Sequence, residues 1–241
     1  SIGDYAFRGC CLTDITIPKN SKLTSIGNGA FESCTSLITI TIPEGVTSIG
    51  KSAFDGCSSL TSSTIPEGVT SIGYGTFRYC SLTDITIPEG VTSIGDYAFY
   101  GCSSLTAITI PEGVTSIGRS AFYRCSSLTA ITIPEGVTSI GWSVFNGCSS
   151  LTTITIPESV TSIGNYAFEN CSSLESLHIG PNVDSYGSDA FAGCTAIKEL
   201  TVMGSIMPEI PSEKLTSITL YSPIPLKTTE FAAMVYRNAT L

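Results

Sequence analysis

The sequence predicts an α/β solenoid in which every turn contributes one strand and one short helical or 3₁₀ segment. A phenylalanine is followed three residues later by a cysteine nine times, at intervals of 22 to 24 residues, from Phe7 and Cys10 to Phe191 and Cys194. The spacing Leu-x-x-Ile-x-Ile-Pro recurs between these pairs. Repeats of this length bury their apolar faces only by stacking on their neighbours, so we expect one elongated domain.

The strand of each repeat precedes a proline. In the reference repeat, residues 105–127, Ile108 and Ile110 alternate with Thr109. Side chains alternate between the two faces of a strand, so the isoleucines are predicted to be buried and Thr109 to face outward. Pro111 ends the strand because proline cannot donate to a ladder.

The rest of the repeat returns the chain to the next strand. Glu112 and Gly113 supply a turn, after which Val114 and Ile117 point to the core. Gly118 is predicted to allow a tight or left-handed bend. A short helical turn is then expected to carry Ala121 and Phe122 inward, with Cys125 one turn further on.

Nine of the ten cysteines occupy one equivalent site per repeat. Equivalent side chains should therefore form a ladder at the strand spacing of about 4.8 Å. A disulfide needs Cβ atoms about 3.8 Å apart on converging vectors, so we expect buried free thiols that pack as small hydrophobes. Cys11 lies outside this register and is expected to face solvent. The absence of any C-x-x-C pair, with His178 as the only histidine, argues against a metal site.

Composition restricts the class of partner. Hydrophobic residues make up 42% of the chain, which is ample for a core, and the formal net charge is −9. Nucleic-acid binding needs a clustered basic surface, which an acidic chain with 13% charged residues does not suggest. No apolar run reaches the length of a membrane span.

The repeated string Ile-Gly-x-x-Ala-Phe-x-x-Cys, followed by Leu-x-x-Ile-x-Ile-Pro, closely resembles the BspA-like leucine-rich repeats of bacterial surface proteins. The resemblance covers residues 1–204, about nine repeats. It implies a right-handed leucine-rich-repeat superhelix with a concave parallel β-sheet and short helical or 3₁₀ turns on the convex side. It also implies a cell-surface or secreted protein used for binding or adhesion, without shared catalytic machinery.

The last part of the chain departs from the repeat. Residues 205–241 are predicted to form an irregular C-terminal repeat and the start of a truncated cap, and residues 203–214 are predicted to be a loop. Leu215 to Leu220 keep the strand spacing, and Glu230 to Tyr236 resemble the helical turn before a final strand. We expect truncation at both ends.

One repeat has a predicted core defect. Ser63 occupies the position where other repeats place isoleucine or leucine. A buried hydroxyl without a partner costs about 1–3 kcal/mol. We therefore expect a local weakness in the third repeat.

The first candidate binding surface is the outward row of the strands. Threonine suits any exposed strand, so this row also has a purely structural interpretation. Its predicted ligand-binding members are Thr41, Thr64, Thr86, Thr109, Thr132, Thr155 and His178.

The second candidate surface lies around the Ala-Phe pairs, on the convex side or its flank. Tyrosine, tryptophan and arginine are enriched at binding hot spots, although the same side chains can simply cover the turns with their polar tips in water. The predicted patch consists of Tyr74, Arg78, Tyr79, Tyr100, Arg119, Tyr123, Arg124 and Trp142.

Catalysis and cofactors are not predicted. His178 is the only imidazole, the ladder cysteines lack a base, and the repeated glutamates from Glu44 to Glu158 have neither calcium-ligand spacing nor unequal environments. The primary hypothesis is a non-enzymatic surface module that binds a host or neighbouring-cell protein or glycan. The alternative is a rigid spacer that displays another domain.

Overall fold

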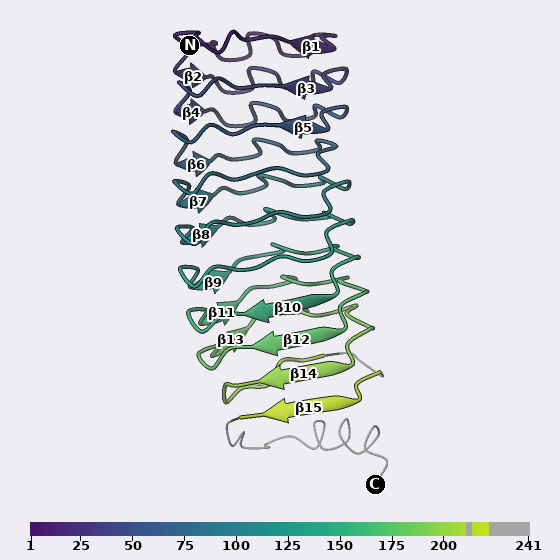
Figure 1. The fold of residues 1–241 in the computed structure, drawn as a ribbon. Helices are drawn as coiled ribbons and strands as arrows, with labels where there is room; N and C mark the ends of the chain where they lie inside the picture. The colour runs from purple at the N-terminus through teal and green to yellow at the C-terminus, as the bar shows by residue number, and fades with distance from the viewer. Residues whose placement is uncertain (211–213, 222–241) are drawn as a thin grey trace.

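A computed structural model describes residues 1–210 and 214–221 as a parallel-strand β-solenoid (Figure 1). Its turns, or rungs, stack in one column from β1 (Asp14–Ile15) to β15 (Ser217–Leu220). We name each rung by its ladder phenylalanine. Every strand pair is parallel and in register, so a residue faces its equivalent in the next rung.

The first row of strands is the predicted one. It is most regular at the C-terminal end, where four-residue strands alternate buried and exposed side chains. Between β5 and β10 it is reduced to bridges such as Thr86 with Thr109 and Ala107 with Ala130. The row comprises β1, β3 (Thr39–Ile40), β5 (Ser62–Ser63), β10 (Thr153–Ile156), β12 (Ser176–Ile179), β14 (Glu199–Val202) and β15.

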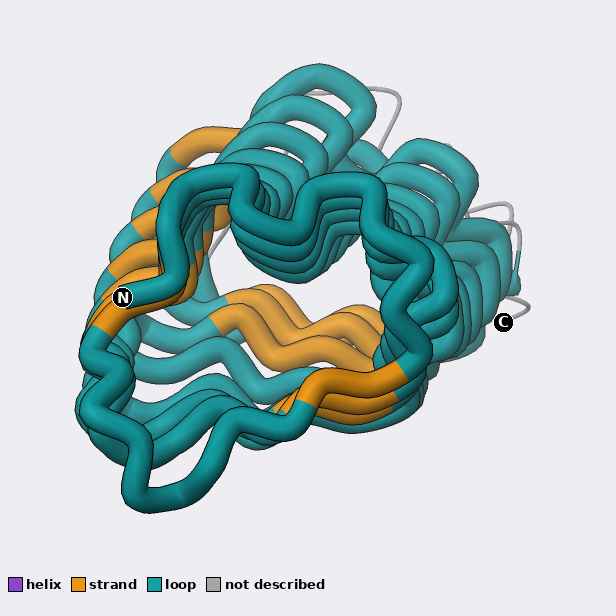
Figure 2. Tube along the Cα trace, turned by 90° about the horizontal axis from the view of Figure 1, so that it is seen from above, coloured by secondary structure: helices purple, strands orange, loops and turns teal. Residues whose placement is uncertain are grey.

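A second row of strands was not predicted from the sequence. Figure 2 shows the two rows on different sides of the solenoid cross-section. Each member is a two-residue strand, usually Ser-Ile, whose second residue points to the core. The row comprises β2 (Ser25–Ile26), β4 (Ser48–Ile49), β6 (Ser71–Ile72), β7 (Ser93–Ile94), β8 (Ser116–Ile117), β9 (Ser139–Ile140), β11 (Ser162–Ile163) and β13 (Ser185–Tyr186).

The prediction of helical or 3₁₀ turns is wrong, because the described residues contain no helix. The third side of each rung is instead a pair of tight turns broken by left-handed residues, with φ of 53° at Ser120 and 55° at Arg124. Alternate amides bond within the rung, as Tyr123 N does to Ser120 O, or across to the next rung, as Phe122 N does to Val144 O. A helix needs successive bonds within one segment, so this alternation excludes it.

The core is a ladder of identical side chains. Neighbouring phenylalanine rings stack with centroids 5.2 to 5.7 Å apart and planes within 18°. From Phe31 to Phe191 these rings are fully buried. Isoleucines from both strand rows close the core around them.

The cysteine ladder is confirmed as a set of buried free thiols. From Cys34 to Cys194, each Sγ lies 2.9 to 3.3 Å from the phenylalanine carbonyl oxygen of the preceding rung and donates to it. All ten cysteines are free, and Cys11 is exposed as predicted. Burial raises the pKa of Cys57, Cys102 and Cys148 to about 12, so these thiols stay protonated.

The turn after each strand is also as predicted. The amide of the valine that follows Pro-Glu-Gly bonds the proline carbonyl, as in Val114 N to Pro111 O at 3.0 Å. Gly118 has a different role from the expected left-handed bend. A Cβ at Gly118 would collide with the backbone of Asp96, so glycine is needed for close approach between rungs.

Two further predictions concern irregular regions. Ser63 Oγ is buried without a hydrogen-bond partner, which confirms the predicted core defect. Strand β15 pairs with β14, which confirms the strand spacing from Leu215 to Leu220. The helical turn expected at residues 230–236 and the final strand at 238–241 lie outside the described residues.

Candidate functional site

The predicted threonine row lies on the first row of strands, with every member exposed. Thr155 faces His178 in the register of β10 and β12, and Thr86 faces Thr109. His178 Nε2 lies 3.1 Å from Ser176 Oγ, which lies 3.4 Å from a carboxylate oxygen of Glu199. The surface is therefore a uniform row of hydroxyls with one imidazole near its C-terminal end.

The flank of the solenoid is different because its side chains change from rung to rung. We call the residues two positions before each ladder cysteine the pairing column, since adjacent members interact in pairs. Arg8 binds Glu32 at 3.0 Å and Arg78 binds Asp55 at 2.9 Å. The column consists of Arg8, Glu32, Asp55, Arg78, Tyr100, Tyr123, Asn146, Glu169 and Ala192.

The middle of the pairing column continues this pattern with uncharged partners. The rings of Tyr100 and Tyr123 stack with centroids 4.6 Å apart. Asn146 Nδ2 donates to Glu169 Oε2 at 2.6 Å, a charge-assisted bond made by a buried amide. The column therefore supplies aromatic surface and hydrogen-bonding groups on four consecutive rungs.

Five residues of the predicted patch gather here. Tyr79 meets Tyr100 edge to face at 5.2 Å, and Arg78 lies 5.4 Å from the Tyr79 ring centroid. Arg124 lies 5.3 Å from the Tyr123 ring centroid. The pKa of Tyr100 is raised by burial and by the neighbouring phenol of Tyr79, so its hydroxyl is a donor at neutral pH.

The other three residues of the patch lie nearer the start of the turn segment. Tyr74 packs against Tyr97, which also contacts Tyr100 at 5.7 Å. Arg119 lies over Tyr97 and pairs with Asp96, while Trp142 packs on Tyr166 at 6.4 Å. Tyr97 therefore connects Tyr74 and Arg119 to the tyrosines of the pairing column. Trp142 packs on Tyr166 instead.

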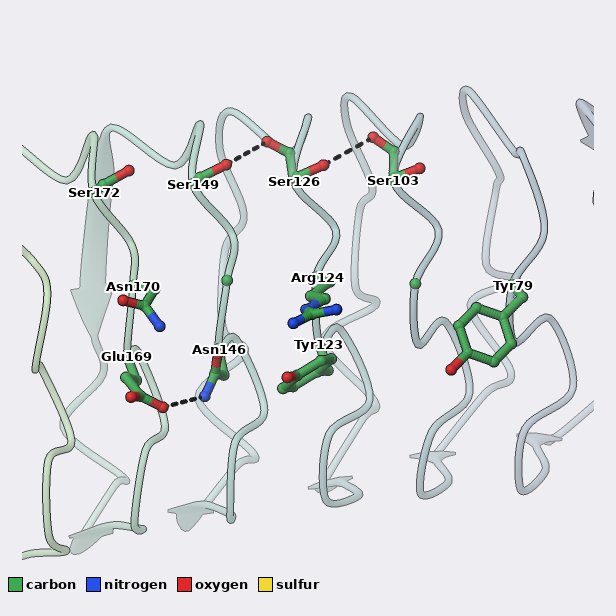
Figure 3. A pocket seen from close by; sticks show the side chains of 12 residues that line it. Tyr79, Ser103, Tyr123, Arg124, Ser126, Asn146, Ser149, Glu169, Asn170 and Ser172 are labelled. Atoms are coloured by element: carbon green, nitrogen blue, oxygen red, sulfur yellow. Dashed lines mark hydrogen bonds between the residues drawn. The ribbon is translucent and has the colours of Figure 1, made fainter.

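A groove of about 800 Å³ runs along the solenoid axis beside the tyrosines and arginines that gather at the pairing column (Figure 3). One wall is a row of serines, and the other is the pairing column from Tyr123 to Glu169. Arg124 and Asn170 lie between the walls, and Tyr79 lies at one end with its ring seen face-on in this view. The lining residues are Tyr79, Gly101, Ser103, Tyr123, Arg124, Ser126, Asn146, Gly147, Ser149, Glu169, Asn170 and Ser172.

The serine wall is held by contacts between rungs. Ser149 Oγ donates to Ser126 O at 3.4 Å, and Ser126 Oγ donates to Ser103 O at 3.5 Å. These long bonds leave the hydroxyl oxygens able to accept a bond from a ligand. The groove is consequently polar along its length.

Sequence reasoning found three of the lining residues and missed the others. It selected aromatic and basic types and passed over Asn146, Glu169 and Asn170, which occupy the same repeat positions as Tyr123 and Arg124. Aligning the repeats on their cysteines exposes these positions. Asn146, Glu169 and Asn170 could have been found from the sequence in this way.

The chemistry of the groove suits recognition. Phenol, amide, hydroxyl, carboxylate and guanidinium groups converge on it, which provides donors and acceptors around a partly aromatic surface. Among the described residues, no group of three or more His, Cys, Asp or Glu side chains could hold a metal ion. In the same part of the chain, no helix is long and apolar enough to span a membrane.

Comparison with known families gives a match over most of the chain. The family described as BspA type leucine rich repeat region (6 copies) matches residues 1–106 and 92–214. None of the curated protein sequences compared with the chain matches it. No enzyme family is indicated by these comparisons.

Two solved structures with this architecture come from bacteria. A leucine-rich repeat protein from Bacteroides ovatus ATCC 8483 is 29% identical, with a TM-score of 0.70 over 86% of this chain and 69% of that one. The leucine rich repeat protein of T. pallidum is 27% identical, with a TM-score of 0.62 over 81% of each chain. A leucine rich cell surface protein from Faecalibacterium prausnitzii A2-165 is 28% identical and covers 99% of this chain and 86% of that one, with a TM-score of only 0.48.

Proposed function

Because the chain belongs to the BspA-type leucine-rich-repeat family, we propose that it is a non-catalytic binding module, at the cell surface or secreted. It recognises a protein or glycan of a host or neighbouring cell through an extended repeat surface and so serves adhesion. The observation that carries the proposal is the groove on the flank, where side chains from successive rungs converge.

The flank is a better candidate than the threonine row for a physical reason. A specific ligand is distinguished by groups of different chemistry at fixed positions. The groove offers such groups on consecutive rungs, whereas the threonine row repeats one hydroxyl. Tyrosine and arginine are also the residues that most often dominate binding energy.

Binding of the purified chain to immobilised extracellular-matrix proteins and glycans tests the proposal. We expect saturable binding to at least one member of the panel. A flank variant with Tyr79→Ser, Tyr100→Ser and Tyr123→Ser should lose it. The matched control carries Thr86→Ser, Thr109→Ser and Thr132→Ser, which keeps the hydroxyl row and should bind as the parent does.

The alternative role is a rigid spacer. The continuous phenylalanine ladder and the inter-rung hydrogen bonds favour it, because they tie each rung to the next along the column. An absence of saturable binding across the panel would support this role and contradict the proposed one. Loss of binding in the threonine variant, with the flank variant unaffected, would reassign the binding face.

A further inference from the structure

The residue just before each ladder cysteine follows an alternation that the family pattern Ala-Phe-x-x-Cys leaves open. We call these residues the alternating column. Glycine occupies every second rung, and a residue with a side chain occupies the rungs between. The column reads Gly9, Ser33, Gly56, Tyr79, Gly101, Arg124, Gly147, Asn170 and Gly193.

All nine positions are left-handed, which costs a non-glycine residue free energy that glycine does not pay. Tyr79, Arg124 and Asn170 have φ of 56°, 55° and 61°. Glycine is therefore compatible with the backbone at each of these positions. The side chains on alternate rungs are held there despite the strain.

Along the groove the alternation has a steric cause. A Cβ added at Gly101 would lie 2.7 Å from Cδ1 of Tyr79, and one at Gly147 would lie 3.1 Å from Cγ of Arg124. Each side chain thus lies along the solenoid axis over the bare glycine of the following rung. Successive side chains of the column are two rungs apart, about 10 Å at the spacing of parallel strands.

Arg124 differs from the other arginines of the described residues. Arg8, Arg78 and Arg119 each form a salt bridge with a carboxylate of an adjacent rung. Arg124 forms none within residues 1–210 and 214–221, and its neighbours in the alternating column are glycines. Its planar set of N–H donors is available for an anionic group in the groove.

Three backbone amides in the middle of the groove are already used and are not free for an extended peptide. The amides of Tyr79, Arg124 and Asn170 bond carbonyl oxygens of the next rung at 2.7 to 2.8 Å. Addition of a strand needs free backbone groups, with pockets for alternate side chains. The groove instead has two tyrosine rings, amides and hydroxyls, which match the apolar face and the hydroxyl groups of a sugar. Its one carboxylate, Glu169, already accepts a hydrogen bond from Asn146.

We propose that the groove binds a linear oligosaccharide that carries carboxylates, of the polyuronate type. The carboxylate of one sugar pairs with Arg124, and a neighbouring sugar ring packs on Tyr79. Asn170 and the serine wall bond sugar hydroxyls. This inference rests on the proposed binding role of the flank and gives that role a ligand class.

Calorimetric titration with α-1,4-linked hexagalacturonate provides the test. The matched ligand is its fully methyl-esterified form, which has the same sugars without the charge. Hexaglutamate is the matched acidic peptide. We expect measurable binding of hexagalacturonate that weakens as salt is raised, and much weaker binding of the ester and the peptide.

Glycine substitutions give variants that the backbone accepts. Arg124→Gly should weaken hexagalacturonate binding about 10- to 100-fold, the size expected for a charge-assisted pair. Tyr79→Gly should weaken binding of both the acid and the ester. Ser33→Gly makes the same exchange in the same column outside the groove, and its affinity should equal that of the parent.

The outcomes separate this inference from the proposed function. No binding of hexagalacturonate, unchanged affinity in Arg124→Gly, or equally tight binding of hexaglutamate would each overturn the polyuronate assignment. If the chain meanwhile binds a protein of the panel and the flank variant loses it, the binding role of the flank stands. If the chain binds neither hexagalacturonate nor any member of the panel, the flank is not a binding surface.

Discussion

The phenylalanine ladder and the pairing column lie next to each other on every rung and are built by opposite rules. The ladder repeats one residue, and each ring stacks on a copy of itself. The pairing column brings together unlike partners, as in Arg8 with Glu32, or interacting uncharged ones, as in Tyr100 with Tyr123. Whether two adjacent rungs are stabilised by identical residues therefore depends on the position of those residues in the rung.

Electrostatics explains the difference. In register, identical charges at two paired positions would lie about 5 Å apart and repel by about 3 kcal/mol at an effective dielectric constant near 20. Glu32 and Asp55 are adjacent members with the same charge, but each is paired with an arginine on its other side. Asp55 and Asn146 are buried, so water does not screen this column well. The glutamates of the turn after the proline are exposed and tolerate repetition. Pairing of unlike partners on the flank therefore contributes to stability, and three members of the pairing column also line the groove.

Alkaline pH should have the largest effect, because it acts on the seven consecutive ladder thiols from Cys34 to Cys171, whose pKa is raised. Thiols with a raised pKa keep their protons in the folded state above pH 9, whereas the unfolded chain releases them. The free energy of unfolding should fall as pH rises from about 9 toward 12, by up to about 1.4 kcal/mol per pH unit for each of these seven thiols. Denaturant unfolding in a reducing buffer measures this slope.

Two cysteine variants provide the controls. Cys102→Ala should make the slope shallower because the pKa of Cys102 is raised to about 12 by burial. Cys11→Ser should leave it unchanged because Cys11 is exposed. A free energy of unfolding that stays constant from pH 8 to 11 would contradict the buried ladder.

Truncation of one ring should have the next largest effect. Phe122 is fully buried and stacks on Phe99 and Phe145, so Phe122→Ala should cost about 3–5 kcal/mol. Phe7 is only partly buried and has the single ring neighbour Phe31 among the ladder residues. Thermal unfolding should show a clearly smaller loss for Phe7→Ala, and equal losses would argue against a stacked spine.

A charge swap tests the rule for the pairing column. Asp55→Arg should destabilise by about 2 kcal/mol, because it removes the partner of Arg78 and places two cations on adjacent rungs, which the attraction of the new arginine to Glu32 offsets in part. Adding Arg78→Asp restores a pair of opposite charges, with the cation now at position 55 and the carboxylate at position 78. Denaturant unfolding of the two single variants and the double variant should show most of the stability recovered, and additive losses would refute pairing.

Repair of the core defect should give the smallest change. Ser63→Ile removes a buried hydroxyl that has no partner and supplies the residue that other rungs use, so we expect a gain of about 1 kcal/mol. Ser62→Ile on the exposed side of β5 is the control and should change stability by less than about 0.5 kcal/mol. A loss of stability in Ser63→Ile would show that the site cannot accept the larger side chain.

The repeat predicted the interior better than the surface. Identical residues at a fixed period identified Phe122 and Cys125 as core, and the thiol geometry followed from strand spacing. The helical turn was wrong because inward residues at Ala121, Phe122 and Cys125 fit both a helix and two tight turns with left-handed residues. The second strand row was missed because a Ser-Ile pair is too short to show alternation.

The groove could be predicted only in part. Tyr79, Tyr123 and Arg124 were recognised by residue type, but Asn146 and Asn170 are recognised only by the positions they occupy. Which residues meet depends on the stacking of rungs, and the sequence does not show that Tyr79 lies over Gly101 until those rungs are superposed.

Hydroxyl-radical footprinting of the chain with its bound partner tests the central claim most directly, because each face carries a reactive side chain. Tyr79, Tyr100 and Tyr123 report on the flank, and His178 reports on the threonine row. We expect the three tyrosines to become protected on binding while His178 reacts as before. Protection of His178 with unchanged tyrosines would contradict the assignment of binding to the flank.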